Sequence, residues 1–254
     1  MTYYLNRIFN DKLKLIITIL FLFLPSFEVL VYLKTYGVHF NELSPNFCTF
    51  LSAKSVDNGH IIQGIILWFL PIYLLIINSE DVIEDKKTGN RNILITYFGK
   101  NKYFFQNLKK SFLISFFIML LALIINFLFV NIAFNNESNL MNTYVNGNNF
   151  MNASLNHPTI TNIAFILITA LLSGIIGTVG TGISLAFHNR QIVYPVVFLI
   201  WLIPCMFKWS LLFSTQPFTE YTPYHMLPAF IFFLCESIIA LIFSYFKGVK
   251  YAKI

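Results

Sequence analysis

Residues 111–134, with the sequence SFLISFFIMLLALIINFLFVNIAF, contain no charged side chain. A helix needs about 20 mainly apolar residues to cross the hydrocarbon core of a bilayer, so this stretch predicts a transmembrane helix. The composition of the whole chain agrees, because 57% of its 254 residues are hydrophobic and only 11% are charged. Soluble domains carry about 25% charged residues. The sequence therefore predicts an integral membrane protein.

Five further apolar runs have the length of a membrane span, and together they predict an all-α, polytopic protein with six transmembrane helices. We expect a single transmembrane domain over residues 1–254, with spans at 15–33, 61–79, 111–134, 161–187, 192–213 and 226–246. The first run follows Arg7, Lys12 and Lys14, as in a signal peptide, but it is long and no small-residue cleavage site follows it. We therefore interpret it as an uncleaved span.

The distribution of Lys and Arg sets the expected orientation. If the N-terminus lies inside, 14 of the 17 Lys and Arg residues fall in cytoplasmic segments, and only Lys34, Lys54 and Lys208 fall outside. Basic residues gather on the cytoplasmic side of membrane proteins, so both ends are expected inside. The net charge of +6 has the same explanation and does not indicate nucleic-acid binding.

Two of the expected outside segments differ in character. Residues 135–157 are rich in Asn and contain no Lys or Arg, so we expect an irregular loop there. Residues 204–228 combine four prolines with Lys208, Glu220 and His225, and cannot continue a simple span. Non-helical backbone at membrane depth survives only where protein or water covers it. This segment predicts a re-entrant hairpin or a structured outer cap, and a plain loop is the alternative.

The segment between spans two and three, residues 80–110, reads EDVIEDKKTGNRNILITYFGKNKYFFQNLKK. Its acidic first part continues the second span as a helix, which Gly89 is placed to end. Four apolar residues then recur at i, i+1, i+4 and i+5: Ile93, Leu94, Tyr97 and Phe98. This spacing predicts a short amphipathic helix over 90–98 on the cytoplasmic face. Such a helix either anchors the loop at the membrane surface or couples the spans to a cytoplasmic motor.

In this segment the chain resembles the permeases of ABC-2 type transporters. An acidic residue after the second span, a Gly-containing segment, paired aliphatics and a Lys that opens the third span match in order: Glu84, Thr88–Gly89, Ile93–Leu94 and Lys109. Gly99 and Lys100 stand where the family often has a proline, a small residue and a basic residue, so the match is loose there. The resemblance covers the whole topology, and within the family it is similar to permeases of lantibiotic immunity and peptide export.

The resemblance implies the transmembrane subunit of an ATP-driven exporter in a bacterial cell membrane. Its expected cargo is an amphipathic, antimicrobial or cytolytic peptide, or a lipid-like molecule. The chain has no glycine-rich phosphate-binding loop, so a separate ABC ATPase subunit would bind ATP and Mg²⁺, and this chain would be neither an enzyme nor bound to a cofactor. The expected partners are that ATPase, a second permease copy or paralogue, and membrane lipid, with no nucleic acid.

The resemblance also implies two short re-entrant helices between spans five and six and a coupling site for the ATPase after span two. The residues expected to couple are Glu80, Asp81, Glu84, Thr88, Gly89, Arg91, Ile93 and Leu94.

Several other residues have predicted roles because of their position in the spans. Glu236, in the sixth span, and Glu28, in the first, are intramembrane carboxyls that serve either function or helix–helix hydrogen bonding, and Lys208 is a candidate partner for either. Gly174, Thr178 and Gly182 recur every four residues and predict close helix packing, within one subunit rather than at a dimer seam. No spacing of Cys, His or acidic residues predicts a metal site or a catalytic constellation.

A membrane enzyme acting on a lipid is the alternative function. Such an enzyme needs clustered His, Asp or Glu near one interface, and the acidic residues at 80–85 are the only candidates for it. A membrane scaffold without transport activity is the third hypothesis.

Overall fold

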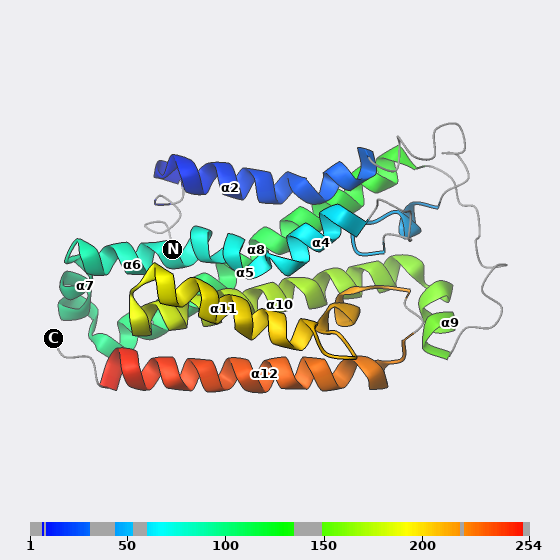
Figure 1. Ribbon diagram of the computed structural model, residues 1–254. Coiled ribbons are helices and arrows are strands. Elements are labelled where there is room, and N and C mark those ends of the chain that lie inside the picture. Colours follow the sequence, from blue (N-terminus) through cyan, green and yellow to red (C-terminus); the bar gives the residue numbers. More distant parts are fainter. Residues whose placement is uncertain are drawn as a thin grey trace.

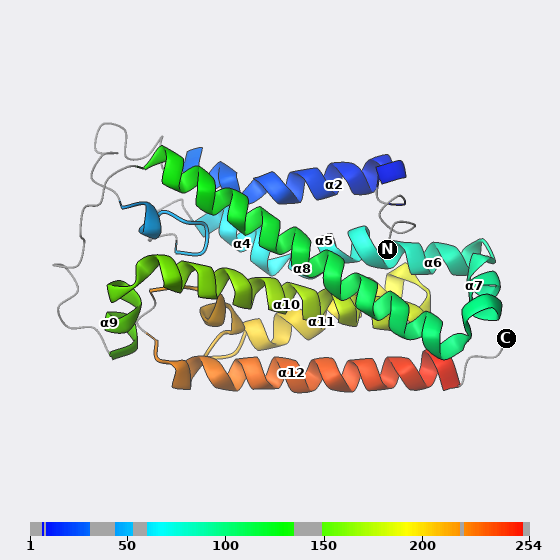
Figure 2. The same ribbon diagram turned by 180° about the vertical axis from the view of Figure 1, so that it is seen from behind.

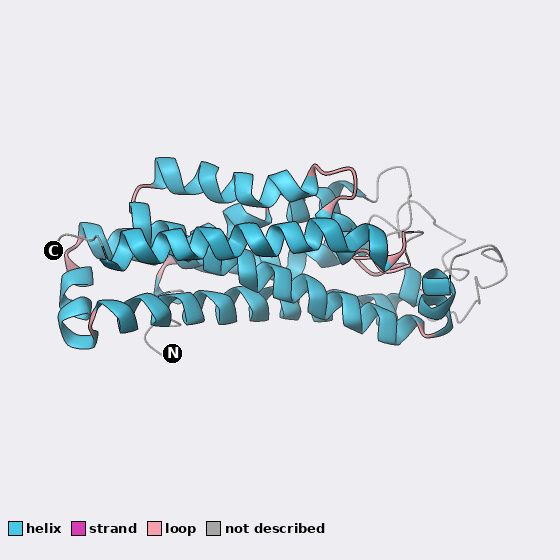
Figure 3. Cartoon of the chain, turned by 90° about the horizontal axis from the view of Figure 1, so that it is seen from below, coloured by secondary structure: helices cyan, strands magenta, loops and turns pink. Residues whose placement is uncertain are grey.

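The computed structural model is an elongated bundle of α-helices, and it describes residues 7, 9–30, 44–52, 60–134, 149–218 and 221–250. The long helices lie roughly side by side along one axis, with the short helix α7 at one end and α9 at the other (Figure 1). All regular structure in these residues is helical (Figure 3). The prediction of an all-α protein is therefore confirmed.

In chain order the α-helices are α2 (Lys12–Phe23), α4 (His60–Trp68), α5 (Leu70–Leu74), α6 (Glu80–Lys87), α7 (Asn90–Phe98), α8 (Lys100–Ala133), α9 (Asn149–Asn156), α10 (Pro158–Phe187), α11 (Arg190–Cys205) and α12 (Pro223–Tyr245). Short 3-10 helices cover Leu24–Ser26, Pro45–Phe47 and Leu211–Thr215, and π-helical turns cover Leu75–Ser79 and Phe246–Lys250.

Four helical stretches among the described residues are long and apolar enough to cross a membrane: Lys12–Leu30, Lys100–Ala133, Pro158–Phe187 and Pro223–Val249. A fifth is the broken pair Ile62–Trp68 and Leu70–Lys87, whose two halves meet at 59°. Helix α11 is apolar but shorter. The chain is thus a multi-pass membrane protein, and the long apolar stretches alternate in direction along the chain, with α4, α5 and α6 running the same way (Figure 2).

The break in the second span has a local cause and a long-range compensation. Pro71 has no N–H to donate and its ring clashes with the preceding turn, so the main-chain ladder is interrupted at Phe69. The carbonyl of Leu67, four residues before Pro71, thereby loses its donor within the helix. The indole of Trp201, on α11, donates a hydrogen bond of 2.8 Å to that carbonyl. A buried backbone group left by the proline is satisfied across the bundle.

Helices α8 and α10 pack closely through glycine. A Cβ added to Gly177 would overlap the side chain of Ser115, whose own Cβ would lie 2.8 Å away, and one on Gly174 would lie 2.8 Å from the ring of Phe112. The Ser111 hydroxyl also donates a hydrogen bond of 2.7 Å to the Gly177 carbonyl. Small residues thus let the two backbones approach until polar groups on one helix reach the other.

The other two members of the glycine and threonine series lie elsewhere on α10. Gly182 faces α12, where an added Cβ would lie 3.0 Å from Leu241. The hydroxyl of Thr178, a partly exposed residue, donates to the Gly174 carbonyl within its own helix at 2.7 Å. The close contacts of this series are therefore made inside one chain.

The structure differs from the sequence-based expectation in the segments at the end with α9. We expected an irregular loop at residues 149–156, but they form helix α9. The helix is stabilised because Met151 and Leu155 lie one turn apart and bury the same face. Residues 135–148 lie outside the described part of the chain, as do most of the loop at 34–60 and the last residues of the first expected span.

Between α11 and α12, the described residues contain one 3-10 helix, Leu211–Thr215, rather than the expected re-entrant hairpin of helices. Prolines on both sides of this segment limit it to a short turn. Leu211 and Thr215 are fully buried, so the segment is a structured cap over the bundle.

Replacing Gly177 with alanine tests the contact between α8 and α10. We expect Gly177→Ala to lower the free energy of unfolding by about 1–3 kcal/mol, because overpacking forces the two helices apart. Gly64→Ala is the matched control, since an added Cβ at Gly64 meets nothing within 4 Å. Unfolding in mixed detergent micelles, followed by tryptophan fluorescence, measures both variants. Equal stability of the two variants would contradict the close packing.

Candidate coupling site at the basic end

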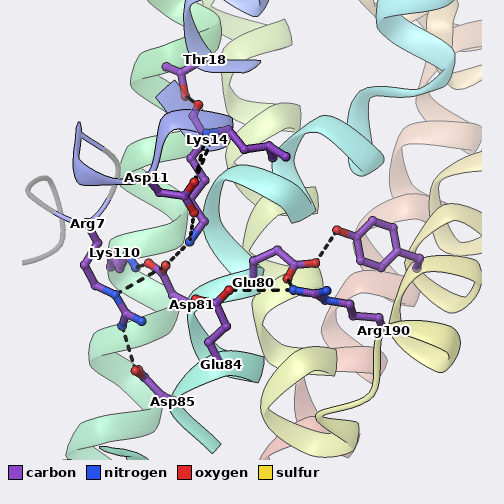
Figure 4. A network of polar contacts seen from close by, with 12 residues as sticks. Arg7, Asp11, Lys14, Thr18, Glu80, Asp81, Glu84, Asp85, Lys110 and Arg190 are labelled. Carbon is purple, nitrogen blue, oxygen red and sulfur yellow. Dashed lines mark hydrogen bonds and ion pairs between the residues drawn. The ribbon is translucent and has the colours of Figure 1, made fainter. Parts of the chain in front are cut away.

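Helix α6 carries two acidic pairs that point in different directions. Glu80 and Glu84 are four residues apart and share one face, and Asp81 and Asp85 share the next. The first pair faces α11 and the second faces the N-terminal segment and α8 (Figure 4). Through its carboxylates this short helix contacts the N-terminal segment, α2, α7, α8 and α11.

Asp81 is the centre of a buried ion cluster. Its Oδ1 is paired with the Nζ atom of Lys14 on α2, and its Oδ2 lies 2.7 Å from the Nζ atom of Lys110 on α8 (Figure 4). The exposed fraction is 1% for the Asp81 side chain and 4% for each of the two lysine side chains. Arg7 adds a longer contact, with its Nε atom 3.6 Å from Oδ1. Burial of so many charges is tolerated because each has an opposite partner.

Asp85 extends this cluster toward α7. Its Oδ1 accepts a hydrogen bond of 2.9 Å from the Arg7 guanidinium and one of 3.0 Å from the side-chain amide of Asn90, the first residue of α7. The chain segment before α2 and the start of α7 are thereby attached to the same carboxylate.

Glu80 makes the contact with α11. One carboxylate oxygen pairs with the Arg190 guanidinium, and the other accepts a hydrogen bond of 2.7 Å from the Tyr194 hydroxyl. Glu84 lies farther from Arg190, at 3.8 Å, and its side chain is 43% exposed. Arg190 and Tyr194 are four residues apart and so lie on the same face of α11.

Helix α7 occupies the residues for which the sequence predicts a short helix, 90–98, and a glycine bounds it on each side. Gly89 has φ of 77° and Gly99 has φ of 81°, left-handed values that L side chains rarely adopt. These two positions turn the chain sharply from α6 into α7 and from α7 into α8.

One face of α7 packs on the bundle. Leu94 and Ile95 lie against a buried cluster formed by Val82, Tyr103, Phe104, Leu185 and Val249. The guanidinium of Arg91 donates to the carbonyl of Gly248, near the end of the last helix, at 3.4 Å. Helix α7 is therefore fixed to α6, α8, α10 and the C-terminal turn.

The opposite face of α7 is exposed and carries two large apolar side chains beside Asn92 and Thr96. Ile93 is 69% exposed and Tyr97, four residues later, is 81% exposed. Thr88, in the turn before α7, is exposed as well. The residues predicted to couple therefore divide into two groups: Glu80, Asp81 and Leu94 contact this chain, whereas Thr88 and Ile93 face outward.

The basic partners of the acidic residues escaped the sequence analysis. Lys14, Lys110 and Arg190 were assigned only to the general excess of positive charge inside. The available signal was that these three residues and the acidic segment all lie at ends of apolar runs expected on the same side of the membrane. The pairings themselves were not predictable, because they join residues 29 to 110 positions apart.

The three predicted intramembrane polar residues do not meet. Glu28 is 1% exposed, and neither of its carboxylate oxygens has a hydrogen-bond partner among the described residues. The same holds for the buried Oε2 atom of Glu236 on α12. Lys208 is exposed and its Nζ atom lies 5.5 Å from the centroid of the neighbouring Trp209 ring. The described part of the chain holds no group of His, Cys, Asp or Glu that fits a metal ion.

Comparison with known proteins finds one informative relative. No protein-family model and no solved structure matches the chain. It is 36% identical over 246 residues to an uncharacterized protein, YybM, of Bacillus subtilis (strain 168), a match that covers 94% of this chain and 96% of the relative. The chain belongs to the YybM family. Because the match runs over nearly the full length of both proteins, the relationship to YybM includes the helical bundle and the acidic segment together.

His188 lies beside the site, in the turn between α10 and α11. It has a left-handed φ of 53°, and its Nε2 atom is buried without a hydrogen-bond partner among the residues that the structure describes. Burial, followed by the positive charges of Arg91 and Lys86, lowers the pKa of His188 from 6.5 to about 3. The imidazole is therefore neutral in the folded protein at neutral pH.

Removing the charge of Asp81 tests the ion cluster. We expect Asp81→Asn to lower the free energy of unfolding by about 3–5 kcal/mol, because two buried ammonium groups then lose their nearest carboxylate. Glu84→Gln, at a half-exposed carboxylate on the same helix, should cost about 1 kcal/mol or less. Unfolding in mixed micelles measures both. Replacing Asp81, Lys14 and Lys110 together by Leu, Met and Met should recover most of the loss, and failure to do so would contradict the account of unpaired charge.

The pKa of His188 predicts a loss of stability in acid. The unfolded chain takes up a proton as the pH falls through 6.5, whereas the folded chain does so only near pH 3, so stability should decline as the pH falls across this window. His188→Asn should reduce that decline, because asparagine tolerates the left-handed conformation and does not titrate. Unfolding midpoints measured from pH 7 to pH 4 test this. Parallel curves for the variant and the wild-type protein would rule out His188 as the cause.

Proposed function

We propose that the protein is the transmembrane permease subunit of an ATP-driven ABC exporter, in which a separate subunit binds ATP and Mg²⁺. The cargo is an amphipathic, antimicrobial or cytolytic peptide, or a lipid-like molecule. The permease acts as a pair with a second copy or a paralogue. Both ends of the chain and α7 lie in the cytoplasm.

Six passes through the membrane are part of this proposal. To the four long helices and the broken span it adds α11, whose 16 residues reach about 24 Å at 1.5 Å per residue. That helix is extended by the cap at Leu211–Thr215. Six alternating passes return α12 to the end at which α2 begins, the end that holds most of the Lys and Arg residues (Figure 1). The positive-inside rule assigns that end to the cytoplasm.

The observation that carries the proposal is the position and attachment of α7. It lies at the basic end of the bundle, fixed by hydrogen bonds and apolar contacts to four other elements, and it presents Ile93 and Tyr97 outward. Paired apolar side chains that are exposed beyond the spans are typical of a protein contact. A rigid attachment is what a motor needs in order to move helices as a body.

The alternative, a membrane enzyme acting on a lipid, finds less support in the same geometry. Of its four candidate carboxylates, Glu80, Asp81 and Asp85 are buried and paired with Lys or Arg, and the half-exposed Glu84 lies 3.8 Å from Arg190. A general acid or base must reach its substrate. These carboxylates instead join the helices of this chain.

Copurification tests the proposed coupling. Affinity-tagged protein extracted from bacterial membranes should bring down an ABC ATPase, and Tyr97→Ala should reduce the recovered ATPase by more than about tenfold. Truncation of an aromatic anchor in an interface typically costs about 2 kcal/mol or more. Tyr224→Ala is the matched control, because Tyr224 is 80% exposed at the other end of the bundle, close to the 81% of Tyr97.

Two outcomes would contradict the proposal. Equal recovery of ATPase with the Tyr97 and Tyr224 variants would remove α7 from the contact. Turnover of a lipid by the purified chain alone, with no ATPase recovered, would favour the enzyme.

A further inference from the structure

A groove on the membrane-facing surface lies between α8 and α12, close to the end with α7. Its volume is about 440 Å³, and its lining is apolar and aromatic, with Phe104, Phe105 and Leu108 on one wall and Leu241, Ile242 and Tyr245 on the other. The start of α8 lies beside the end of α12, and the two helices diverge from there (Figure 2).

The groove has a fixed floor and an open side. Phe104 is 2% exposed and belongs to the buried cluster that also holds α7. On the rim, Phe105 is 58% exposed and Ile242 is 52% exposed. Both walls belong to stretches long and apolar enough to cross a membrane, and the α8 wall lies just before the expected span at 111–134, so the open side faces the lipid near the membrane surface. An elongated hydrocarbon chain fits such a lining without leaving a polar group unpaired.

The end of the groove nearest α7 is polar. The Tyr245 hydroxyl donates a hydrogen bond of 3.3 Å to the side-chain oxygen of Asn101, and the Tyr245 ring packs edge-on against Phe104 with centroids 5.6 Å apart. The hydrocarbon lining therefore ends at the level where the lipid headgroups begin.

Two lysines flank the α8 wall of the groove, Lys102 at this end and Lys109 directly after Leu108. Lys102 and Lys109 lie three residues before and four residues after Phe105, so all three side chains share one face of α8. Both lysines are exposed, and the Nζ atom of Lys102 lies 5.7 Å from the centroid of the Phe98 ring. The sequence of α8 contains no acidic residue, and that of α12 contains only Glu236, nine positions before Tyr245. Neither helix that forms a wall of the groove therefore carries an acidic side chain near the two lysines.

We propose that this groove binds an anionic phospholipid, with one acyl chain between α8 and α12 and its phosphate between Lys102 and Lys109. Flexible lysine side chains keep their stems along apolar surface and direct the ammonium group to the interface. Anionic lipids enrich the cytoplasmic leaflet, and basic residues near its surface attract them. The pairing of an apolar channel with two cations favours a lipid over an apolar partner protein. The site depends on the membrane location of the chain and not on export.

Native mass spectrometry of the purified protein tests the proposal. The protein in detergent is mixed with palmitoyl-oleoyl phosphatidylglycerol or with palmitoyl-oleoyl phosphatidylcholine, and the lipid retained on each chain is counted. We expect one tightly held phosphatidylglycerol and weaker retention of phosphatidylcholine. Lys102→Gln with Lys109→Gln should weaken phosphatidylglycerol binding about 30-fold, or about 2 kcal/mol at roughly 1 kcal/mol per basic residue.

The matched control replaces two exposed lysines at the same end but outside the groove. Lys86→Gln with Lys87→Gln removes the same charge from α6 and should leave phosphatidylglycerol binding within about twofold of wild type. Equal loss in the two double variants would show attraction to the charged end in general and would overturn the proposed site.

A second pair of variants tests the acyl-chain groove itself. Ile242→Trp narrows the opening and should reduce retention of phosphatidylglycerol, whereas Ile239→Trp, at a 67% exposed position of α12 outside the groove lining, should not. Equal retention of the two lipids by the wild-type protein would overturn the proposal. So would a dimer that holds no lipid and that dissociates on Ile242→Trp, because a second copy would then cover the groove.

Discussion

The pairing of Asp81 with Lys14 and Lys110 is the constraint on which the basic end of the bundle depends. A buried charge is costly unless its partner lies at hydrogen-bond distance, so the three helices that carry these residues can shift along one another only slightly. The relative heights of α2, α6 and α8 are thereby set by a contact between single atoms, whereas the apolar packing elsewhere along the spans tolerates sliding. Glu80 extends the same constraint to α11 through Arg190 and Tyr194.

The exposed surface of α7 inherits its position from this cluster. Asp85 binds both Arg7 and Asn90, so the acidic helix that anchors the N-terminal segment also anchors the first turn of α7. Gly89 then turns the chain, and Leu94 and Ile95 hold the helix against the bundle. A partner that binds Ile93 and Tyr97 therefore touches an element connected to four others. The apolar groove at α8 and α12 shares Phe104 with that attachment, so the groove and the exposed face of α7 lie on two sides of the same buried cluster.

Features set by neighbouring residues were predictable from the sequence, and features set by distant residues were not. The bounds of α7 follow from Gly89, Gly99 and the spacing of four apolar residues, all within one short segment. The spans follow from hydropathy. In contrast, Lys110 reads as an ordinary cytoplasmic lysine until Asp81 is brought to it by the packing of α6 on α8. Likewise, we expected one continuous span at 61–79, and nothing near Pro71 indicates that Trp201 satisfies the carbonyl freed at the break. Helix α9 was missed because its polar composition outweighed the single turn that joins Met151 to Leu155.

The break at Phe69 divides the second span into two helical halves that meet at that residue. The half from Leu70 to Lys87 carries the ion cluster and leads directly into α7. The other half, His60–Trp68, leads toward the opposite membrane surface. Trp201 of α11 donates a hydrogen bond to the Leu67 carbonyl in one half, beside the break, and Arg190 of the same helix forms an ion pair with Glu80 in the other half. Helix α11 thus connects the two halves across the break. A force that turns α7 must therefore either bend α11 or turn α11 together with both halves of the second span.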